Sequence, residues 1–314
     1  MKKTSFAIAA LMLVFGIACT PEDNTPKEVL ATAIELSAHE LTLEKGANAI
    51  LTVTFTPSNA TKRDIAWVSS NTGIATVNDG VVVGVASGET EIIAKCGEAV
   101  DRCKVTVPGP PKGAVDLGIV MTREDGTTYN LYWAESNLCG SYLCNNPEDY
   151  GDYYAWGETE IKPDYSWSTY KFGTSASGPF SKYNTISSYG AVDNKTELDP
   201  EDDAAHIKLG GKWRMPTDSE WTALREKCTW AWTTRNGISG YKVTGSNGDS
   251  IFLPAGGLRY ETRLAGDTIV GNYLSSSLVT DSPYLVWYIY FHSDSIHRLG
   301  IERYCGLTIR PVSE

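Results

Sequence analysis

The chain has 314 residues and carries 27 basic against 38 acidic side chains, a formal net charge of −11. A surface with this balance does not attract phosphate backbones, so the composition argues against a nucleic-acid partner. Hydrophobic residues make up 42% of the chain, enough for about two domains that each bury a core.

The first 18 residues have the pattern of an export signal. Lys2 and Lys3 precede an apolar run at residues 5–18 that is too short to span a bilayer. The run ends in small residues directly before Cys19, which resembles the lipobox of bacterial lipoproteins. The resemblance implies that Cys19 becomes the acylated N-terminus and that the protein is lipid-anchored in the outer membrane and exposed at the cell surface. The alternative is an ordinary signal peptide followed by an unmodified cysteine.

Residues 19–32 begin with a polar, proline-containing stretch and are predicted to form a tether. Aromatic residues then divide the chain, because all 17 tyrosines lie at or after Tyr129. This shift in composition predicts two separate cores. A proline-rich linker at residues 109–113 separates a first domain at 33–108 from a second at 114–314.

The first domain is predicted to be an all-β sandwich. Short segments with period-two alternation, such as residues 51–55 and 75–77, are separated by turn signals. The order and spacing of residues across 33–108, including the run WVSSN at 67–71, resemble the bacterial immunoglobulin-like group 2 domain. That resemblance implies a spacer in a surface protein or adhesin, with no catalytic residue.

Two cysteines lie near the end of this domain on neighbouring predicted strands. If Ile92 and Val107 both face the core, Cys96 and Cys103 do so as well, across a hairpin. We therefore predict a cross-strand disulfide between them, which an exported protein permits. The alternative is a pair of buried free thiols.

The second domain contains signals for both helices and strands. Asp199 and Pro200 are typical of a helix start and predict a short helix that extends through His206. Thr217 and Glu220 form a capping box, which predicts a second helix with apolar residues at helical spacing. The remainder is predicted to be strands and long loops, which makes the domain α+β.

Several motifs of this domain are distinctive: EDYGDYYAWGET at residues 148–159, LDPEDDAA at 198–205, WRMPT at 213–217, NGISGY at 236–241 and LTIRPV at 307–312. Together they resemble the Fibrobacter succinogenes major paralogous domain, a family similar to the C-type lectin fold. The resemblance implies a C-type-lectin-like domain over residues 114–314 and leaves its ligand undefined.

Patterns for metal-dependent or covalent chemistry do not emerge from the sequence. The acid-rich run at residues 193–203 lacks EF-hand spacing, so we interpret it as helix-capping and solvated rather than as a Ca²⁺ loop. The four histidines lack zinc-ligand spacing, and no nucleophile elbow or phosphate loop is present. We therefore expect no metal, no cofactor and no enzymatic activity.

Four cysteines of the second domain permit three pairings. Cys139 and Cys144 lie close together around a glycine and are predicted to pair locally. That pairing leaves Cys228 to pair with Cys305, which would join a predicted helix to the terminal region. If the latter two were instead solvent-exposed thiols of low pKa, they would indicate an enzyme of the sulfatase-modifying type.

Alternation along residues 284–292 predicts a strand with two different faces. One set is uniformly apolar and is expected to face the core: Leu285, Trp287, Ile289 and Phe291. The opposite set is too aromatic for an ordinary solvent face, so we predict that Tyr288, Tyr290 and His292 contact a ligand, with Arg303 and Tyr304 at the rim. The resemblance supports this, because in variable lectin-fold proteins the same C-terminal stretch carries the ligand contacts. The alternative is a second buried face.

These elements together predict a protein that presents a binding domain at the cell surface. A lipid anchor and tether would carry an Ig-like spacer and a lectin-like head that binds a glycan or protein ligand, with the membrane contacted through the anchor only. One alternative is a structural surface or fimbria-associated component, against which a long exposed aromatic face would count. The other is the sulfatase-modifying type of enzyme.

Overall fold

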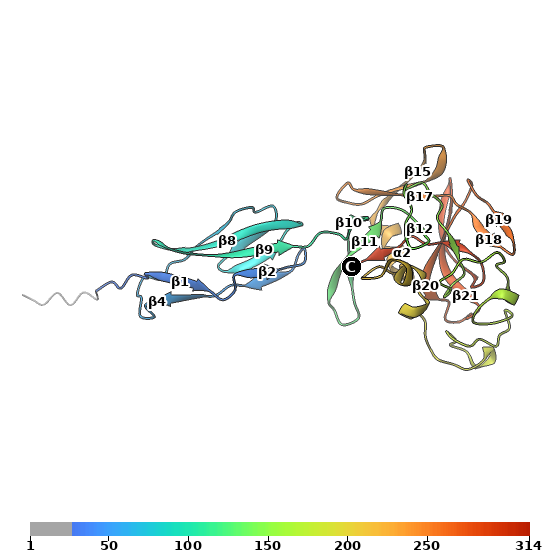
Figure 1. Ribbon diagram of the computed structural model, residues 1–314, viewed down its shortest axis with the longest axis horizontal. Coiled ribbons are helices and arrows are strands. Elements are labelled where there is room, and N and C mark those ends of the chain that lie inside the picture. The colour runs from blue at the N-terminus through green and yellow to red at the C-terminus, as the bar shows by residue number, and fades with distance from the viewer. Residues whose placement is uncertain (1–26) are drawn as a thin grey trace, which may run out of the picture. The chain divides into compact units, whose positions relative to one another are not determined.

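The computed structural model describes residues 27–314 (Figure 1). The predicted signal peptide, the lipidation site Cys19 and the tether up to residue 26 lie outside the described residues. The chain divides into two compact units, one ending at Pro108 and the other spanning Gly109–Glu314. Within the described part of the chain, no helix is both long enough and apolar enough to cross a membrane.

The first unit is built from strands. They are β1 (Ala33–Leu36), β2 (Glu40–Thr42), β3 (Asn48–Ile50), β4 (Val53–Thr56), β5 (Ala66–Ser69), β6 (Ala75–Asn78), β7 (Val81–Gly84), β8 (Gly88–Cys96) and β9 (Ala99–Val107). One sheet has the order β2-β9-β8-β5, and shorter sheets pair β3-β7-β6 and β1-β4. Side chains from all three sheets share one core, in which Val82, Ile92 and Val105 have no exposed surface. This is the packing expected of a β-sandwich.

The strand predicted at residues 51–55 is divided in two. The chain leaves β3 at Ile50 and enters β4 at Val53, and the intervening Leu51 bonds through its backbone N–H to the carbonyl of Gly80 at 2.8 Å. Because β3 and β4 belong to different sheets, Leu51 lies where the chain crosses between them. Residues 51–55 do alternate between more buried and exposed side chains, but they pass from one sheet to the other and do not form a single strand.

The predicted disulfide between Cys96 and Cys103 is wrong. Both side chains face the core, as the alternation requires, but both thiols are free. In the β8–β9 hairpin Cys96 lies opposite Ala99, whereas Cys103 lies opposite Ile92, four positions further along. At about 3.3 Å per residue the offset is about 13 Å, well beyond the reach of a disulfide.

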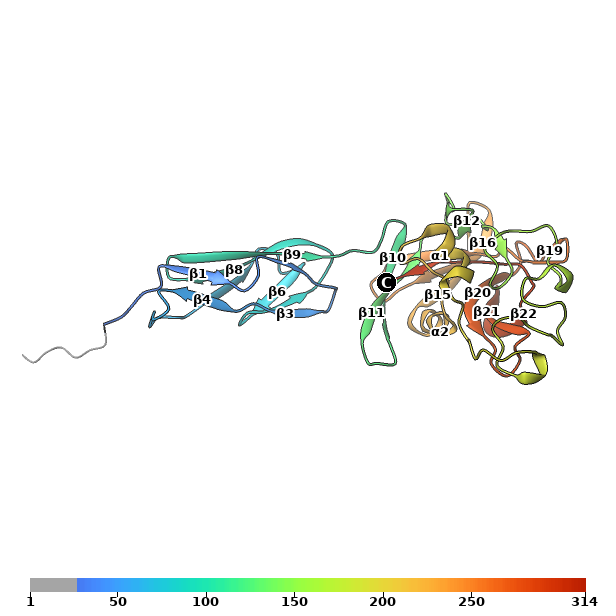
Figure 2. The same ribbon diagram turned by 60° about the horizontal axis from the view of Figure 1, so that its bottom comes forward.

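The second unit is β-rich with two α-helices among its described elements. The strands are β10 (Ala114–Thr122), β11 (Thr128–Ala134), β12 (Leu138–Cys139), β13 (Tyr142–Leu143), β14 (Tyr153–Tyr154), β15 (Thr229–Arg235), β16 (Ile238–Thr244), β17 (Ser250–Pro254), β18 (Leu258–Tyr260), β19 (Arg263–Ala265), β20 (Gly271–Leu278), β21 (Leu285–His292), β22 (Ser295–Glu302), β23 (Leu307–Thr308) and β24 (Val312–Ser313). The helices are α1 (Ala204–Leu209) and α2 (Asp218–Lys227), with 3-10 turns at Trp167–Thr169, Ser187–Tyr189 and Pro200–Asp202 (Figure 2).

A five-stranded sheet, in the order β14-β23-β20-β21-β22, lies at the centre of this unit. Its two faces contribute to different core clusters. Leu274 and Val286 belong to one cluster, whereas their neighbours Tyr273 and Ile289 belong to the other, together with Trp221 of α2. The central strands are therefore buried on both faces.

The first strands of the second unit and its last strand belong to one sheet. Strand β24 pairs with β11, so that Ser313 lies opposite Tyr132 and Val312 opposite Trp133. Both views show β10 and β11 beside the C-terminus (Figures 1 and 2). Val312 and Ser313 are almost completely buried, so this pairing is part of the interior.

The two predicted helix starts have different outcomes. The capping box at Thr217 and Glu220 is confirmed, with both reciprocal hydrogen bonds present at the start of α2. The helix predicted from Asp199 is instead interrupted: a 3-10 turn follows Asp199, and α1 begins only after Asp203, whose carboxylate accepts from the backbone N–H of His206. The second cap gives α1 a start of its own.

The local disulfide between Cys139 and Cys144 is confirmed, with an S–S distance of 2.05 Å. The predicted pairing of Cys228 with Cys305 is wrong, because both thiols are free. Cys305 lies in the core cluster on one face of the central sheet, whereas Cys228 packs against the cluster on the other face. The sheet itself keeps the two sulfur atoms apart.

Candidate ligand-binding groove

Strand β21 does not present the predicted ligand face. Ile289 and Phe291 are buried as expected, but Tyr288 is only 9% exposed and belongs to the core cluster on the opposite face of the sheet. Burial raises the pKa of the Tyr288 phenol to about 12. Leu285 and Trp287, predicted to be core residues, are half-buried instead. The prediction for Tyr288 is therefore wrong, and the alternative of a second buried face is correct at this position.

Arg303 and Tyr304 do not line an exposed rim either. Arg303 has no exposed surface, and its guanidinium donates to the carbonyl oxygens of Pro283 at 3.1 Å and Tyr183 at 3.0 Å. Burial lowers the pKa of Arg303. Tyr304 is also buried and donates its hydroxyl to Glu302 at 2.8 Å. Both residues hold loops together inside the unit, so the rim prediction is wrong for both.

The remaining two predicted residues stay accessible at the β21–β22 hairpin. Tyr290 and His292 are half-buried. The Tyr290 ring stacks on His297 at a centroid distance of 6.2 Å, and both histidines hydrogen-bond Ser295 Oγ, at 2.7 Å for His292 and 2.9 Å for His297. These residues form a small surface cluster at the β21–β22 hairpin.

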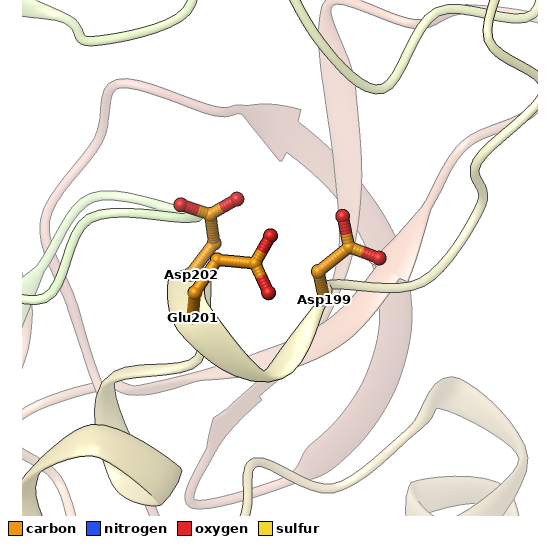
Figure 3. A group of neighbouring side chains, drawn as sticks. All are labelled: Asp199, Glu201 and Asp202. Carbon is orange, nitrogen blue, oxygen red and sulfur yellow. The ribbon is translucent and has the colours of Figure 1, made fainter.

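Three carboxylates converge in the acid-rich segment: Asp199, Glu201 and Asp202 (Figure 3). Their ligand atoms lie within 4.8 Å of one another, but Lys182 Nζ lies among them, 2.6 Å from Asp199 and 2.5 Å from Asp202. Burial alone would lower the pKa of Lys182, yet the hydrogen bonds to these carboxylates raise it. A metal ion would have to displace this ammonium group.

An open groove of about 480 Å³ lies beside β14, where the EDYGDYYAWGET motif passes through the structure. Its walls come from residues 151–153, residues 161–163, Tyr165 and Arg259. The volume is in the range of small-ligand sites, which is about 300–1,000 Å³. The groove therefore brings one of the distinctive motifs together with a residue about a hundred positions further along the chain.

Two tyrosines form the buried floor of the groove. Tyr153 pairs with Thr308 of β23 and donates its hydroxyl to the carbonyl of Gly256 at 2.5 Å. Tyr165 donates its hydroxyl to the carbonyl of Tyr153 and packs flat against Gly306, where a Cβ atom would lie only 2.5 Å from the ring. Burial raises the pKa of both phenols, so both stay neutral at physiological pH.

The charged groups of the groove differ in the hydrogen bonds and ion pairs that they form. Lys162 Nζ lies 2.8 Å from the Glu158 carboxylate and also donates to a backbone carbonyl at 3.1 Å. Asp152 Oδ2 accepts from the backbone N–H of Gly140 at 2.7 Å. Arg259 is held by two backbone hydrogen bonds to Gly306, and its guanidinium carbon lies 5.3 Å from the centroid of the Tyr153 ring. Within residues 27–314 that guanidinium has neither a hydrogen bond nor an ion pair.

The lining of the groove offers several kinds of polar group to a ligand. These are carboxylate, ammonium, guanidinium and neutral phenol groups, and the lining contains no thiol. Elsewhere in the unit, burial raises the pKa of the Cys305 thiol to about 12 and also raises that of Cys228. Both thiols are therefore protonated near neutral pH and do not have the low pKa that the sulfatase-modifying alternative requires.

Comparison with known proteins agrees with the sandwich of the first unit. An all-β sandwich of this length is typical of immunoglobulin-like domains. Residues 30–107 match the family described as the bacterial Ig-like domain (group 2), which confirms the resemblance for this unit. The family match ends before the second unit begins.

One curated relative is an Ig-like virion protein of Serratia phage KSP90, which is 37% identical over 109 residues. The match covers 33% of this chain and 42% of the virion protein, so less than half of that relative is represented. Among solved structures, the S-layer protein SbsC domains 4 and 5 align at 25% identity over 26% of this chain and 53% of that chain, with a TM-score of 0.23. SbsC domains 5-6 align at 14% identity over 87% of this chain and 97% of that one, with a TM-score of 0.24.

Proposed function

We propose that the protein is a lipid-anchored surface protein whose second unit binds a glycan or protein ligand in the groove beside β14. The Ig-like domain acts as the spacer, and the second unit is the C-type-lectin-like head. The observation that carries the proposal is the Arg259 guanidinium, which lies in an open groove without a partner among the described residues. The distinctive motif at the same groove supports the assignment of the head. The protein performs no catalysis.

Blocking the groove tests the proposed binding function. Ile161 is 58% exposed at the groove wall, so Ile161→Trp narrows the groove without disturbing the core. We expect it to weaken binding of any ligand found on glycan and peptide arrays at least about tenfold, or 1.4 kcal/mol. Val120→Trp, at an exposed position on β10, is the matched control and should bind like the wild type. Equal binding by the two variants would contradict the proposal.

The anchor is tested separately at Cys19. Several acyl chains on one residue anchor a protein stably, so we expect Cys19→Ala to shift the full-length protein from the detergent phase to the aqueous phase at least about tenfold in a phase-partition assay. Thr20→Ala, at the next position, should remain in the detergent phase. If Cys19→Ala partitions like the wild type, the protein is not anchored through this residue.

A purely structural role at the cell or particle surface is the second candidate. The observation that favours it is the similarity to a relative that is itself named a virion protein. In that case the glycan and peptide arrays would give no ligand whose binding is weakened by Ile161→Trp.

A further inference from the structure

We infer that the groove beside β14 selects an acidic sugar, a pyranose that carries a carboxylate, and that Arg259 holds this carboxylate. The inference rests on the proposed function, because it names the ligand class of the same groove. It concerns residues that the sequence motifs did not single out as ligand contacts.

The first step is the charge of the groove. Lys162 is neutralised by Glu158, so Arg259 is the cation of the groove that lacks a counter-ion among the described residues. Its planar guanidinium presents donors in a fork that matches the two oxygens of a carboxylate. Stacking over the Tyr153 ring limits its side-chain freedom before the ligand arrives, which lowers the entropy cost of binding.

The second step is the choice between anions. A single free guanidinium compensates one negative charge, and the chain as a whole carries a formal charge of −11. A phosphate dianion would therefore leave uncompensated charge next to the carboxylate of Asp152 in the same groove. A monoanionic carboxylate brings one negative charge beside Asp152 where a phosphate dianion brings two, so it is repelled less in this groove.

The third step is the rest of the ligand. Asp152 uses Oδ2 to accept from Gly140, whereas its Oδ1 has no hydrogen bond within the described chain. A carboxylate oxygen only accepts, so the ligand must bring donors, and sugar hydroxyls are such donors. Ile161 and Pro163 are exposed at the wall and offer apolar surface to the C–H face of a pyranose ring. A carboxylate, hydroxyl donors and an apolar face occur together in uronic and sialic acids.

Matched ligand pairs test the inference on the full chain. Binding of sialyllactose is compared with that of lactose, and binding of trigalacturonate with that of its methyl ester, by titration calorimetry. We expect the acidic member of at least one pair to bind about 10- to 100-fold more tightly, and Arg259→Met to remove that difference. Arg259→Lys should recover only part of it, because an ammonium lacks the bidentate fork.

Arg263→Met is the control, since Arg263 is exposed on the neighbouring strand β19 and outside the groove lining. It should bind like the wild type, and all variants should keep the wild-type thermal transition. Neutral ligands that bind as tightly as acidic ones, or an Arg259→Met variant that keeps its preference, would overturn the inference while Ile161→Trp still supports the groove. Groove binding of an acidic peptide instead of either sugar acid would also overturn it. If Ile161→Trp has no effect on any ligand, the proposed function fails as well.

Discussion

Replacing Arg310 with methionine is expected to destabilise the second unit by at least about 3 kcal/mol. Arg310 has no exposed surface, and its guanidinium donates to Asn137 Oδ1 at 2.8 Å and to the carbonyls of Ala134 at 2.9 Å and Phe252 at 2.7 Å. Methionine fills similar space but removes all three of these buried hydrogen bonds, and each buried acceptor that is left unpaired costs about 1–3 kcal/mol. Burial lowers the pKa of Arg310 to about 10, which still leaves it charged at neutral pH.

Urea unfolding followed by tryptophan fluorescence measures this loss, because every tryptophan except Trp67 lies in the second unit. Arg263→Met removes an exposed arginine of the same unit and should change the free energy of unfolding by less than about 0.5 kcal/mol. An Arg310→Met variant that is as stable as this control would show that the buried acceptors find other partners.

The second large effect is expected at Glu220, where alanine should cost about 3–5 kcal/mol, as breaking a buried ion pair does. The Glu220 side chain has no exposed surface and binds Arg214 at 2.5 and 2.7 Å. It also accepts from the Tyr129 hydroxyl and from the backbone N–H of Thr217, each at 2.8 Å. Alanine therefore removes the α2 capping box and leaves the Arg214 guanidinium without its counter-ion.

The same residue should make stability depend on pH. Burial alone would raise the pKa of Glu220, but the hydrogen bonds and charge of Arg214 outweigh it and hold the pKa below its ordinary value of 4.5. A carboxyl with a lowered folded-state pKa stabilises the fold above its unfolded pKa and loses that contribution as the pH falls through the folded one. We expect the wild type to lose stability below about pH 4.5, and Glu220→Gln to lose less over the same window. Urea unfolding at pH 7 and pH 3.5 measures this, with the exposed Glu226→Gln as control. Parallel losses in all of these proteins would assign the acid sensitivity to other groups.

The features that could be predicted from the sequence are those that local chemistry decides. The capping box at Thr217 needs only residues three positions apart, and the disulfide of Cys139 with Cys144 closes a short loop. The start at Asp199 fails because the Asp199 carboxylate does not cap the turn and instead binds Lys182 and Lys195. The residues next to Asp199 in the sequence do not show which lysines its carboxylate binds in the folded chain.

The errors arise where burial depends on what lies on both sides of an element. Alternation in β21 correctly separates its two faces, but it cannot show that Tyr288 meets a second core cluster instead of solvent. Arg303 looks like a surface residue because arginine usually is, yet three backbone carbonyls satisfy its guanidinium in the interior. For Cys96 and Cys103 the predicted face is correct but the predicted register is wrong, because the register of a hairpin depends on the position of its turn.

The groove itself could be predicted only in part. The motif at residues 148–159 contains Asp152 and Tyr153, which line it. Arg259 joins them through its backbone bridge to Gly306, a contact between segments with no shared sequence pattern. A glycine pair at 256–257 directly before Leu258 was the available signal of an unusual backbone there, and it does not indicate a ligand.

The pairing of β24 with β11 also bears on how the second unit folds during synthesis. A chain that is synthesised from its N-terminus delivers β11 long before Val312 and Ser313 arrive to pair with it. Until then Tyr132 and Trp133, both buried in the finished unit, lack the strand that covers them. Contacts this distant in sequence form slowly. The second unit should therefore complete its fold only after the last residues have been synthesised, and chains that end before residue 312 should be degraded by proteases.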